Sequence, residues 1–487
     1  MQPSSTAYTV ADRKWPAAVV AALAISVAGC FGDEDTAGRV DSAANINTAG
    51  NIAQASADDY DDNVDGLITA ATLQTWIDNW EGNRPAGIDG RLVILQVNAD
   101  YSNGNPTAQS YITPDPAAGV VTYRIDPGRL TEKRSNGVIY SRSMVPSGAQ
   151  MDSFLEDYGL DPTEDLIVWA MGDVRDDGSA FPAMQQGRGW YAMRYWGTPR
   201  ANLAMLNGAA TQVMNSNYLG GTATCDESLM DDGDDCLPRS GKVSVRDLPE
   251  DNFALQATLE DVVAVAEGRS QAFLWDARSH DEYTARGDTL DDVDFRNDAS
   301  KQGHPNNAVQ LPYGHIMDAS DWSYRDKETI RDYLDGKEID GAQFVRYDGQ
   351  GEVQPLGEGN AYRDGQTVIT YCETTFRAMM TGFASAAILG YPTRFYDGAT
   401  VEWNSLSAQR DRHGNMLLPA DSPWRTDLVT RSHFRYNAPS NIHSRQIDDP
   451  YADHTNRILR EDRAYKLGDS VDEDDGPGVA PPASPCG

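Results

Sequence analysis

One short segment of this 487-residue chain places a nucleophile and a cation at a fixed spacing. Cys372 is separated by four residues from Arg377. The residues between them are Glu373, Thr374, Thr375 and Phe376. A thiolate is a strong nucleophile that can form a covalent intermediate. The residue types therefore suggest covalent chemistry at Cys372, close in sequence to the positive charge of Arg377.

The elements on either side must hold the thiol at the edge of a sheet. The apolar run 367–371 predicts a buried strand that ends directly before the cysteine. Met379 and Phe383 recur at helical spacing, which predicts a helix over 376–389 that Gly390 ends. Ligands of open α/β sheets bind at the carboxyl ends of strands, where helix N-termini carry partial positive charge. We therefore expect loop amides to surround the thiol and to lower its pKa from about 8.5.

Three further motifs flank this loop. Residues 276–283 read DARSHDEY, and Ser279 and Glu282 within them form a capping box for the next helix. Residues 303–312 read GHPNNAVQLP, and residues 396–403 read YDGATVEW. Together with the C-x4-R loop, these motifs resemble, in order, those of the rhodaneses, a family of sulfurtransferases.

The resemblance implies a two-step sulfur transfer. The Cys372 thiolate would take the outer sulfur of a small anionic donor such as thiosulfate or 3-mercaptopyruvate, forming a persulfide. A thiol or cyanide acceptor would then remove that sulfur. The resemblance also implies that residues 373–377 and Arg278 bind the substrate, with Arg278 salt-bridged to orient the site, and that no cofactor is needed. Within this loop, Arg377 would either contact the substrate or brace the loop.

Two residues depart from the family pattern. Thr375 stands where the loop usually has glycine, which restricts positive backbone φ angles. Glu373 adds a negative charge beside the thiol, which would raise the thiol pKa and weaken thiosulfate binding. We expect these departures to limit thiosulfate turnover rather than the fold.

The predicted fold class is α/β, with two tandem rhodanese-like domains that are each a parallel sheet flanked by helices. The predicted strands are 92–95, 165–169, 201–206, 272–275, 367–371 and 394–396. The predicted helices are 67–76, 151–158, 189–196, 259–265 and 376–389. In the first copy, Met171, Gly172 and Asp173 follow the loop strand in place of a cysteine, so this copy should be structural.

Composition and periodicity suggest six segments. They are a lipoprotein signal peptide (1–30), a flexible tether (31–60), an inactive N-terminal rhodanese-like domain (61–215), a linker (216–252), a catalytic C-terminal rhodanese-like domain (253–408), and a polar extension with an acidic tail (409–487).

The N-terminus has the features of an export signal. Arg13 and Lys14 precede the apolar run 17–27, which is too short to span a bilayer comfortably. The tetrapeptide ending at Cys30 resembles a bacterial lipobox, so we expect Cys30 to be lipidated, although an ordinary signal peptide is the alternative. Phe31 follows in place of aspartate, and the resemblance then implies an envelope location facing the periplasm, at the outer membrane.

The other cysteines suggest no metal site. Cys225 and Cys236 lie in a polar stretch and could pair in an exported compartment, or remain two loop thiols. Cys486 is given no role. The chain lacks CxxC and CxxCH motifs, so neither zinc nor c-type haem is expected. Residues 61–66 resemble half of a calcium loop, but its twelfth position is Thr72, and we predict no metal.

The net charge of −34 argues against a nucleic-acid partner. Three classes of function remain: a sulfurtransferase, a non-catalytic rhodanese-like envelope lipoprotein that binds or assembles with a protein partner, and a phosphatase or arsenate reductase of related fold. The last class usually has five residues between Cys and Arg, so the four found here favour sulfur over phosphate.

Overall fold

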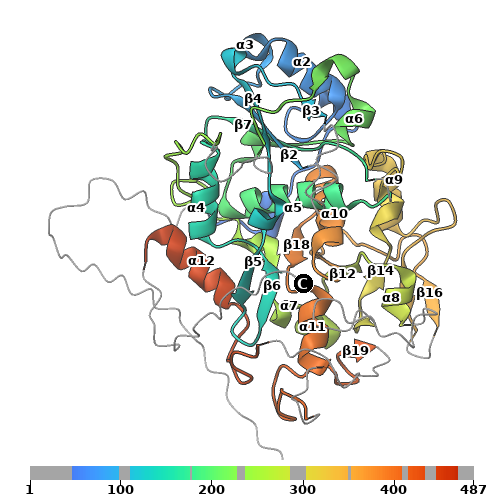
Figure 1. Cartoon of the computed structure of the whole chain (residues 1–487). Coiled ribbons are helices and arrows are strands. Elements are labelled where there is room, and N and C mark those ends of the chain that lie inside the picture. Colours follow the sequence, from blue (N-terminus) through green and yellow to red (C-terminus); the bar gives the residue numbers. More distant parts are fainter. Residues whose placement is uncertain are drawn as a thin grey trace, which may run out of the picture. The chain divides into compact units, whose positions relative to one another are not determined.

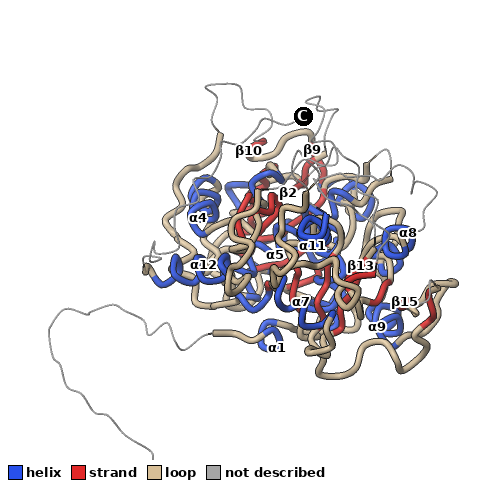
Figure 2. The backbone as a smooth tube through the Cα atoms, turned by 90° about the horizontal axis from the view of Figure 1, so that it is seen from below, coloured by secondary structure: helices blue, strands red, loops and turns tan. Residues whose placement is uncertain are grey.

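Two parallel β-sheets, one in each half of the chain, organise the molecule (Figure 1). The computed structural model describes residues 46–97, 110–175, 178–226, 236–285, 303–348, 352–408, 415–433 and 446–469. Strands form the interior and most helices lie outside them (Figure 2). The long apolar runs of the strands are typical of strands that are covered on both faces.

The first sheet has the order β1-β8-β7-β2-β4-β10, and all of its pairs are parallel. Its strands are β1 (Gly66–Ile68), β8 (Leu203–Leu206), β7 (Leu166–Met171), β2 (Leu92–Val97), β4 (Val120–Arg124) and β10 (Cys225–Asp226). The helices of this half are α2 (Ala70–Asp78), α3 (Trp80–Asn83), α4 (Gly148–Asp157), α5 (Phe181–Trp196) and α6 (Ala210–Val213).

The second sheet has the order β11-β18-β17-β12-β14-β15-β16, and its last two strands are antiparallel to their neighbours. The strands are β11 (Gln256–Ala257), β18 (Thr393–Tyr396), β17 (Val368–Tyr371), β12 (Phe273–Asp276), β14 (Val309–Gln310), β15 (Val345–Tyr347) and β16 (Val353–Pro355). Its helices are α7 (Leu259–Ala266), α8 (His280–Thr284), α9 (Lys327–Asp335), α10 (Phe376–Phe383), a π-helical continuation (Ala384–Leu389) and α11 (Ala399–Ala408).

The two sheets share one strand order. In each half, the first five parallel strands in chain order lie as first, fifth, fourth, second and third across the sheet, and β10 adds a sixth at the edge of the first sheet. The predicted parallel α/β class with flanking helices is therefore confirmed. Helix α5 is buried along almost its whole length because it contacts both the first sheet and α10.

Short elements complete the fold. They are the hairpin of β5 (Glu132–Ser135) and β6 (Tyr140–Met144), the pair β3 (Tyr111–Ile112) and β9 (Leu219–Gly220), the pair β13 (His304–Pro305) and β19 (Ser432–His433), and the helices α1 (Ala49–Ile52) and α12 (Arg457–Leu467).

Several segments differ from the sequence-based expectation. The helix predicted from Leu67 begins at Ala70, because Leu67 lies in the edge strand β1 and Thr69 caps the helix. Within the predicted tether, residues 46–60 are not free: the N–H groups of Gln54 and Ser56 donate to carbonyls of the π-helical segment after α10. Within the predicted linker, β10 extends the first sheet.

The polar extension returns to the first half of the chain. Its helix α12 packs on α4 and β5, and Ile458 on this helix is buried. Asp462 accepts hydrogen bonds from the Arg134 guanidinium, at 2.6 Å and 2.9 Å, and from the Tyr195 hydroxyl at 2.7 Å. The extension therefore completes the polar interior of the first half, which its irregular sequence did not suggest.

A second buried ion pair joins the two halves directly. Arg188 of α5 forms a two-point ion pair with Asp397, the residue after β18, and neither side chain is exposed. Asp397 also accepts the Val145 N–H at 2.5 Å. Burying both charges is tolerable only because each is paired and hydrogen-bonded.

The structure joins Cys225 and Cys236 in a disulfide with Cα atoms 5.4 Å apart. Cys30 and Cys486 lie outside the described residues. None of the helices in the described part of the chain combines the length and apolar character that a bilayer crossing requires.

Replacing Arg188 with Met should destabilise the protein by roughly 3–5 kcal/mol, because it leaves the Asp397 carboxylate buried without its cation. The control is Arg325→Gln, which removes a half-exposed pair with Asp340 and should cost less than about 1 kcal/mol. Urea unfolding of both variants measures the difference. Equal losses in the free energy of unfolding would show that the buried Arg188–Asp397 pair stabilises the protein no more than the half-exposed Arg325–Asp340 pair does.

Candidate active site

Cys372 lies directly after β17 and four residues before α10. It is the free cysteine among the described residues, and it is 1% exposed. Ala277, Ala378 and Tyr313 pack around it. The predicted position at the carboxyl end of a strand is thus found, but the sulfur is more enclosed than the sequence suggested.

The loop after Cys372 is held in a left-handed backbone conformation at Thr375, where φ is 68°. This conformation costs a residue with a Cβ about 1–2 kcal/mol. The buried Thr375 hydroxyl lies 2.8 Å from the Asp397 carbonyl oxygen and 3.1 Å from that of Tyr396, to which it donates. Thr375, which departs from the family pattern, therefore holds this left-handed conformation through the hydrogen bonds of its side chain rather than through the conformational freedom of a glycine.

The first turn of α11 fixes the carbonyl side of the same loop. The Thr400 N–H donates to the Cys372 carbonyl, and the Val401 N–H donates to the Glu373 carbonyl, both at 3.1 Å. Both residues belong to the YDGATVEW motif, so this motif positions the cysteine loop through backbone hydrogen bonds.

The amide side of the loop is left open. Within the described residues, the backbone N–H groups of Thr374, Thr375, Phe376 and Arg377 donate to no protein acceptor. The first N–H groups of a helix favour negative charge. No hydrogen bond to the Cys372 sulfur is formed in the described part of the chain, so the amides can serve a bound anion but do not hold the thiol as expected.

Arg377 braces the loop against α8. Its guanidinium donates to both oxygens of Glu282, at 2.7 Å and 2.8 Å, and lies 3.6 Å from the Glu373 carboxylate. Burial raises the pKa of Glu282, but the hydrogen bonds and charge of Arg377 outweigh it and lower the pKa to about 2. Of the two roles considered for Arg377, the geometry supports bracing.

Glu282 is itself positioned by the capping box that the sequence predicted. The Ser279 side chain accepts the Glu282 N–H, and the Glu282 carboxylate accepts the Ser279 N–H at 3.1 Å. The Glu282 carboxylate thus caps the N-terminus of α8 and also binds the Arg377 guanidinium.

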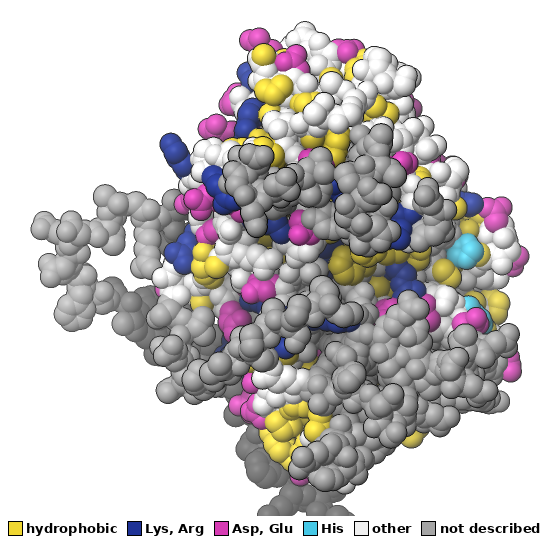
Figure 3. All heavy atoms as spheres, in the orientation of Figure 1, with side chains coloured by type: hydrophobic (Ala, Val, Ile, Leu, Met, Phe, Trp, Pro, Cys, Tyr) yellow, Lys and Arg dark blue, Asp and Glu magenta, His cyan; other side chains and the backbone are white. Residues whose placement is uncertain are grey.

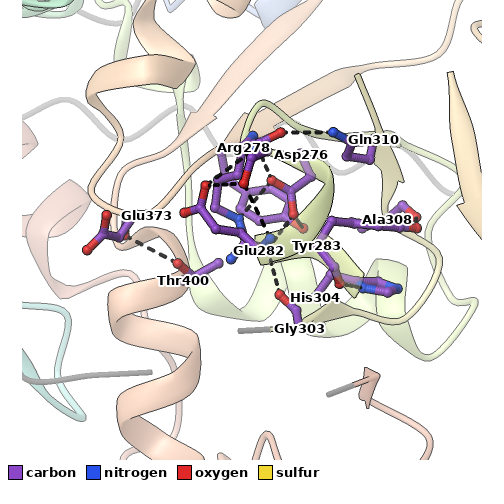
Figure 4. A network of polar contacts seen from close by, with 12 residues as sticks. Asp276, Arg278, Glu282, Tyr283, Gly303, His304, Ala308, Gln310, Glu373 and Thr400 are labelled. Carbon is purple, nitrogen blue, oxygen red and sulfur yellow. Dashed lines mark hydrogen bonds and ion pairs between the residues drawn. The ribbon is translucent and has the colours of Figure 1, made fainter. Parts of the chain in front are cut away.

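Arg278 belongs to the framework behind the site (Figure 4). It is fully buried and donates to Asp276 at 2.9 Å and 2.5 Å and to the Gly303 carbonyl at 2.5 Å. Asp276 also accepts the Tyr371 hydroxyl at 2.7 Å. The expected salt bridge is present, and it directs the guanidinium to Asp276; a substrate contact through Arg278 stays a prediction.

The sequence did not reveal Tyr313 and Phe181 as aromatic neighbours of the loop. Tyr313, which follows the GHPNNAVQLP motif, packs beside the thiol and stacks on Trp322 at 6.0 Å between ring centroids. Phe376 contacts Phe181, the first residue of α5, at 5.9 Å. Isolated aromatics in loops and at helix starts give no periodic signal, so only the fold brings them together.

The comparisons with known proteins bear on this half of the chain. Residues 258–406 match the family model of the rhodanese-like domain. No curated protein matches the chain.

Three of the solved structures that are similar to this chain are described by their identity, TM-score and coverage. The anaerobic ergothioneine biosynthesis enzyme from Chlorobium limicola, in complex with trimethyl histidine, is 16% identical, with a TM-score of 0.47, over 69% of this chain and 68% of that one. SseA from Escherichia coli, a 3-mercaptopyruvate sulfurtransferase, is 14% identical, with a TM-score of 0.41, over 69% and 98%. Tum1 from Saccharomyces cerevisiae is 14% identical, with a TM-score of 0.43, over 70% and 95%.

The family match covers the capping box, the GHPNNAVQLP and YDGATVEW motifs and the Cys372 loop, and the sheet around them is parallel and flanked by helices. The chain therefore contains a rhodanese-like domain over residues 258–406.

Proposed function

We propose that this protein is a sulfurtransferase that carries a sulfane sulfur as a persulfide on Cys372. The observation that carries the proposal is the position of this thiol. It lies at the carboxyl end of β17, inside the rhodanese-like domain, next to the open amides of Thr374 to Arg377.

The transfer needs two displacements at sulfur. In the first, the Cys372 thiolate attacks the outer sulfur of the donor, a new S–S bond forms, and the donor remainder leaves with the electron pair of the broken bond. For thiosulfate that remainder is sulfite, and for 3-mercaptopyruvate it is the enolate of pyruvate. In the second, an acceptor thiolate or cyanide attacks the terminal sulfur and releases the Cys372 thiolate.

The amides of the loop would stabilise the negative charge that the donor brings and the leaving group takes away. Arg377 acts as a positioning residue in this scheme, because Glu282 and Glu373 already surround its guanidinium. The backbone therefore supplies most of the positive potential at this site.

Two further proposals concern the first half of the chain and Cys30. The first half is a second rhodanese-like copy without a catalytic cysteine, and the shared strand order of the two sheets supports this. We also propose that a lipid on Cys30 anchors the protein to the cell envelope, at the outer membrane and facing the periplasm, because the residues ending at Cys30 resemble a lipobox and Phe31 follows them.

A second function is a non-catalytic envelope protein that binds a partner. Two observations favour it: Cys372 is 1% exposed, and the Glu373 carboxylate lies on the same loop. This alternative requires that no persulfide forms when the protein meets a sulfur donor.

The wild-type protein, given thiosulfate or 3-mercaptopyruvate and cyanide, should produce thiocyanate and should gain the mass of one sulfur atom on the Cys372 peptide. Cys372→Ala should abolish both signals, because it removes the nucleophile. Cys372→Ser, which keeps the side-chain shape, serves as the folding control by circular dichroism. Thiocyanate formation that survives in Cys372→Ala would remove this residue from the mechanism, and a wild type without persulfide would support the non-catalytic alternative.

Glu373→Gln should raise kcat/KM for thiosulfate by about tenfold, since it removes a negative charge from the loop that receives a dianion. The gain with 3-mercaptopyruvate, which carries one negative charge, should be smaller. Glu328→Gln in the first turn of α9 is the control. Unchanged thiosulfate kinetics in Glu373→Gln would show that this carboxylate does not limit donor binding.

The Arg377–Glu282 pair should make stability depend on pH in the acid range. Because the pKa of Glu282 falls from 4.5 to about 2 on folding, the pair stabilises the protein above pH 4.5, and this contribution is lost as the pH falls toward 2. Glu282→Gln should lower the free energy of unfolding at pH 7 by about 1–3 kcal/mol and should flatten this part of the pH profile.

Asp281→Asn, an exposed change on the same helix, is the matched control. Urea unfolding at neutral and acid pH gives the profile for both variants. Parallel profiles for Glu282→Gln and the wild type would show that the pair contributes nothing measurable.

A further inference from the structure

A cavity of about 430 Å³ lies at the far end of the second sheet from Cys372. Strand β14 pairs with β12 only at Trp275 and Asp276, so it does not extend beside Phe273 and Leu274. These two residues line the cavity, together with Tyr347 of β15. The shortness of β14 thus leaves a gap in the sheet surface, of a size that suits a small molecule.

The lining of this cavity differs from the rest of the protein in charge. About one residue in seven of the chain is acidic, yet none of the nineteen lining residues is Asp or Glu. Two of them are arginines, Arg346 on β15 and Arg363 on the loop before β17. In Figure 3, by contrast, acidic side chains are spread over the visible face of the molecule.

Both arginines have guanidinium groups that no described residue pairs with. Arg346 and Arg363 are exposed, and in the described part of the chain neither side chain forms a hydrogen bond or an ion pair. Asp348 and Asp364 are close to them in sequence but do not line the cavity. Guanidinium groups bind carboxylate, sulfate and phosphate oxygens through paired N–H donors.

The two histidines of the cavity add polarity without charge. His304 is buried, donates a hydrogen bond from its Nδ1 to the Tyr283 carbonyl at 2.7 Å, and has its pKa lowered to about 3, mainly by burial. Burial also lowers the pKa of His433. Both rings are therefore neutral at pH 7, and the positive potential of the cavity comes from the arginines.

We propose that this cavity binds a small anion with two acidic groups, each a phosphate, sulfate or carboxylate, that pair with Arg346 and Arg363. The site is separate from the thiol. Phe273 pairs with Val368 at the start of β17, whereas Cys372 follows its end, four residues or roughly 13 Å away. Binding here therefore does not depend on sulfur transfer.

The test is calorimetric titration of the full-length protein with inorganic pyrophosphate, sulfate and malonate at constant ionic strength, with chloride as the monovalent control. Pyrophosphate or malonate should bind with a stoichiometry of one and more tightly than sulfate, which has a single acidic group. The double variant Arg346→Gln/Arg363→Gln should weaken that binding by about tenfold or more, because both charged contacts are lost.

Two variants separate this site from others. Arg331→Gln, an exposed arginine of α9, and Cys372→Ala should both bind as the wild type does. Absence of saturable binding to the wild type, equal affinity in the double variant, or loss of binding in Cys372→Ala would each overturn the proposal.

Discussion

The buried carboxylate of Asp397 is the point on which both sheets and the cysteine loop depend. Its side chain pairs with Arg188 and accepts the Val145 N–H, both from the first half of the chain. Its main-chain oxygen accepts the Thr375 hydroxyl of the loop. Because an unpaired buried charge is costly, the Arg188–Asp397 pair holds the two halves in one arrangement. The hydrogen bond from Thr375 to the Asp397 carbonyl then fixes the cysteine loop relative to both halves.

Much of the fold could be predicted from sequence, because its signals are local. Buried runs such as 92–95 and 367–371 identified strands, and the Ser279–Glu282 spacing identified a capping box. Helix α12 was missed because its apolar face is small: Ile458 is buried and Leu459 and Tyr465 are partly buried, but six of its eleven residues are charged. Its position is decided by Arg134, more than 300 residues earlier, and no local pattern records such a pair.

The position of Cys372 between a strand and a helix could be predicted from the sequence, but its contacts could not. The spacing of Cys372 and Arg377 placed both on one loop, yet it left two roles for the arginine, and only the distance to Glu282 separates them. The enclosure of the thiol depends on Tyr313, which reaches it from a different part of the chain. The two arginines nearest the site, Arg377 and Arg278, are each paired with a carboxylate, Glu282 and Asp276 respectively.

The position of α12 has a consequence for how the chain matures. Arg134 is buried in the first half, but its carboxylate partner, Asp462, is made 328 residues later. During synthesis, the Arg134 guanidinium therefore lacks its buried carboxylate partner until almost the whole polypeptide has been made. Folding is therefore not strictly vectorial, and the first half acquires its native polar interior only when the last helix docks.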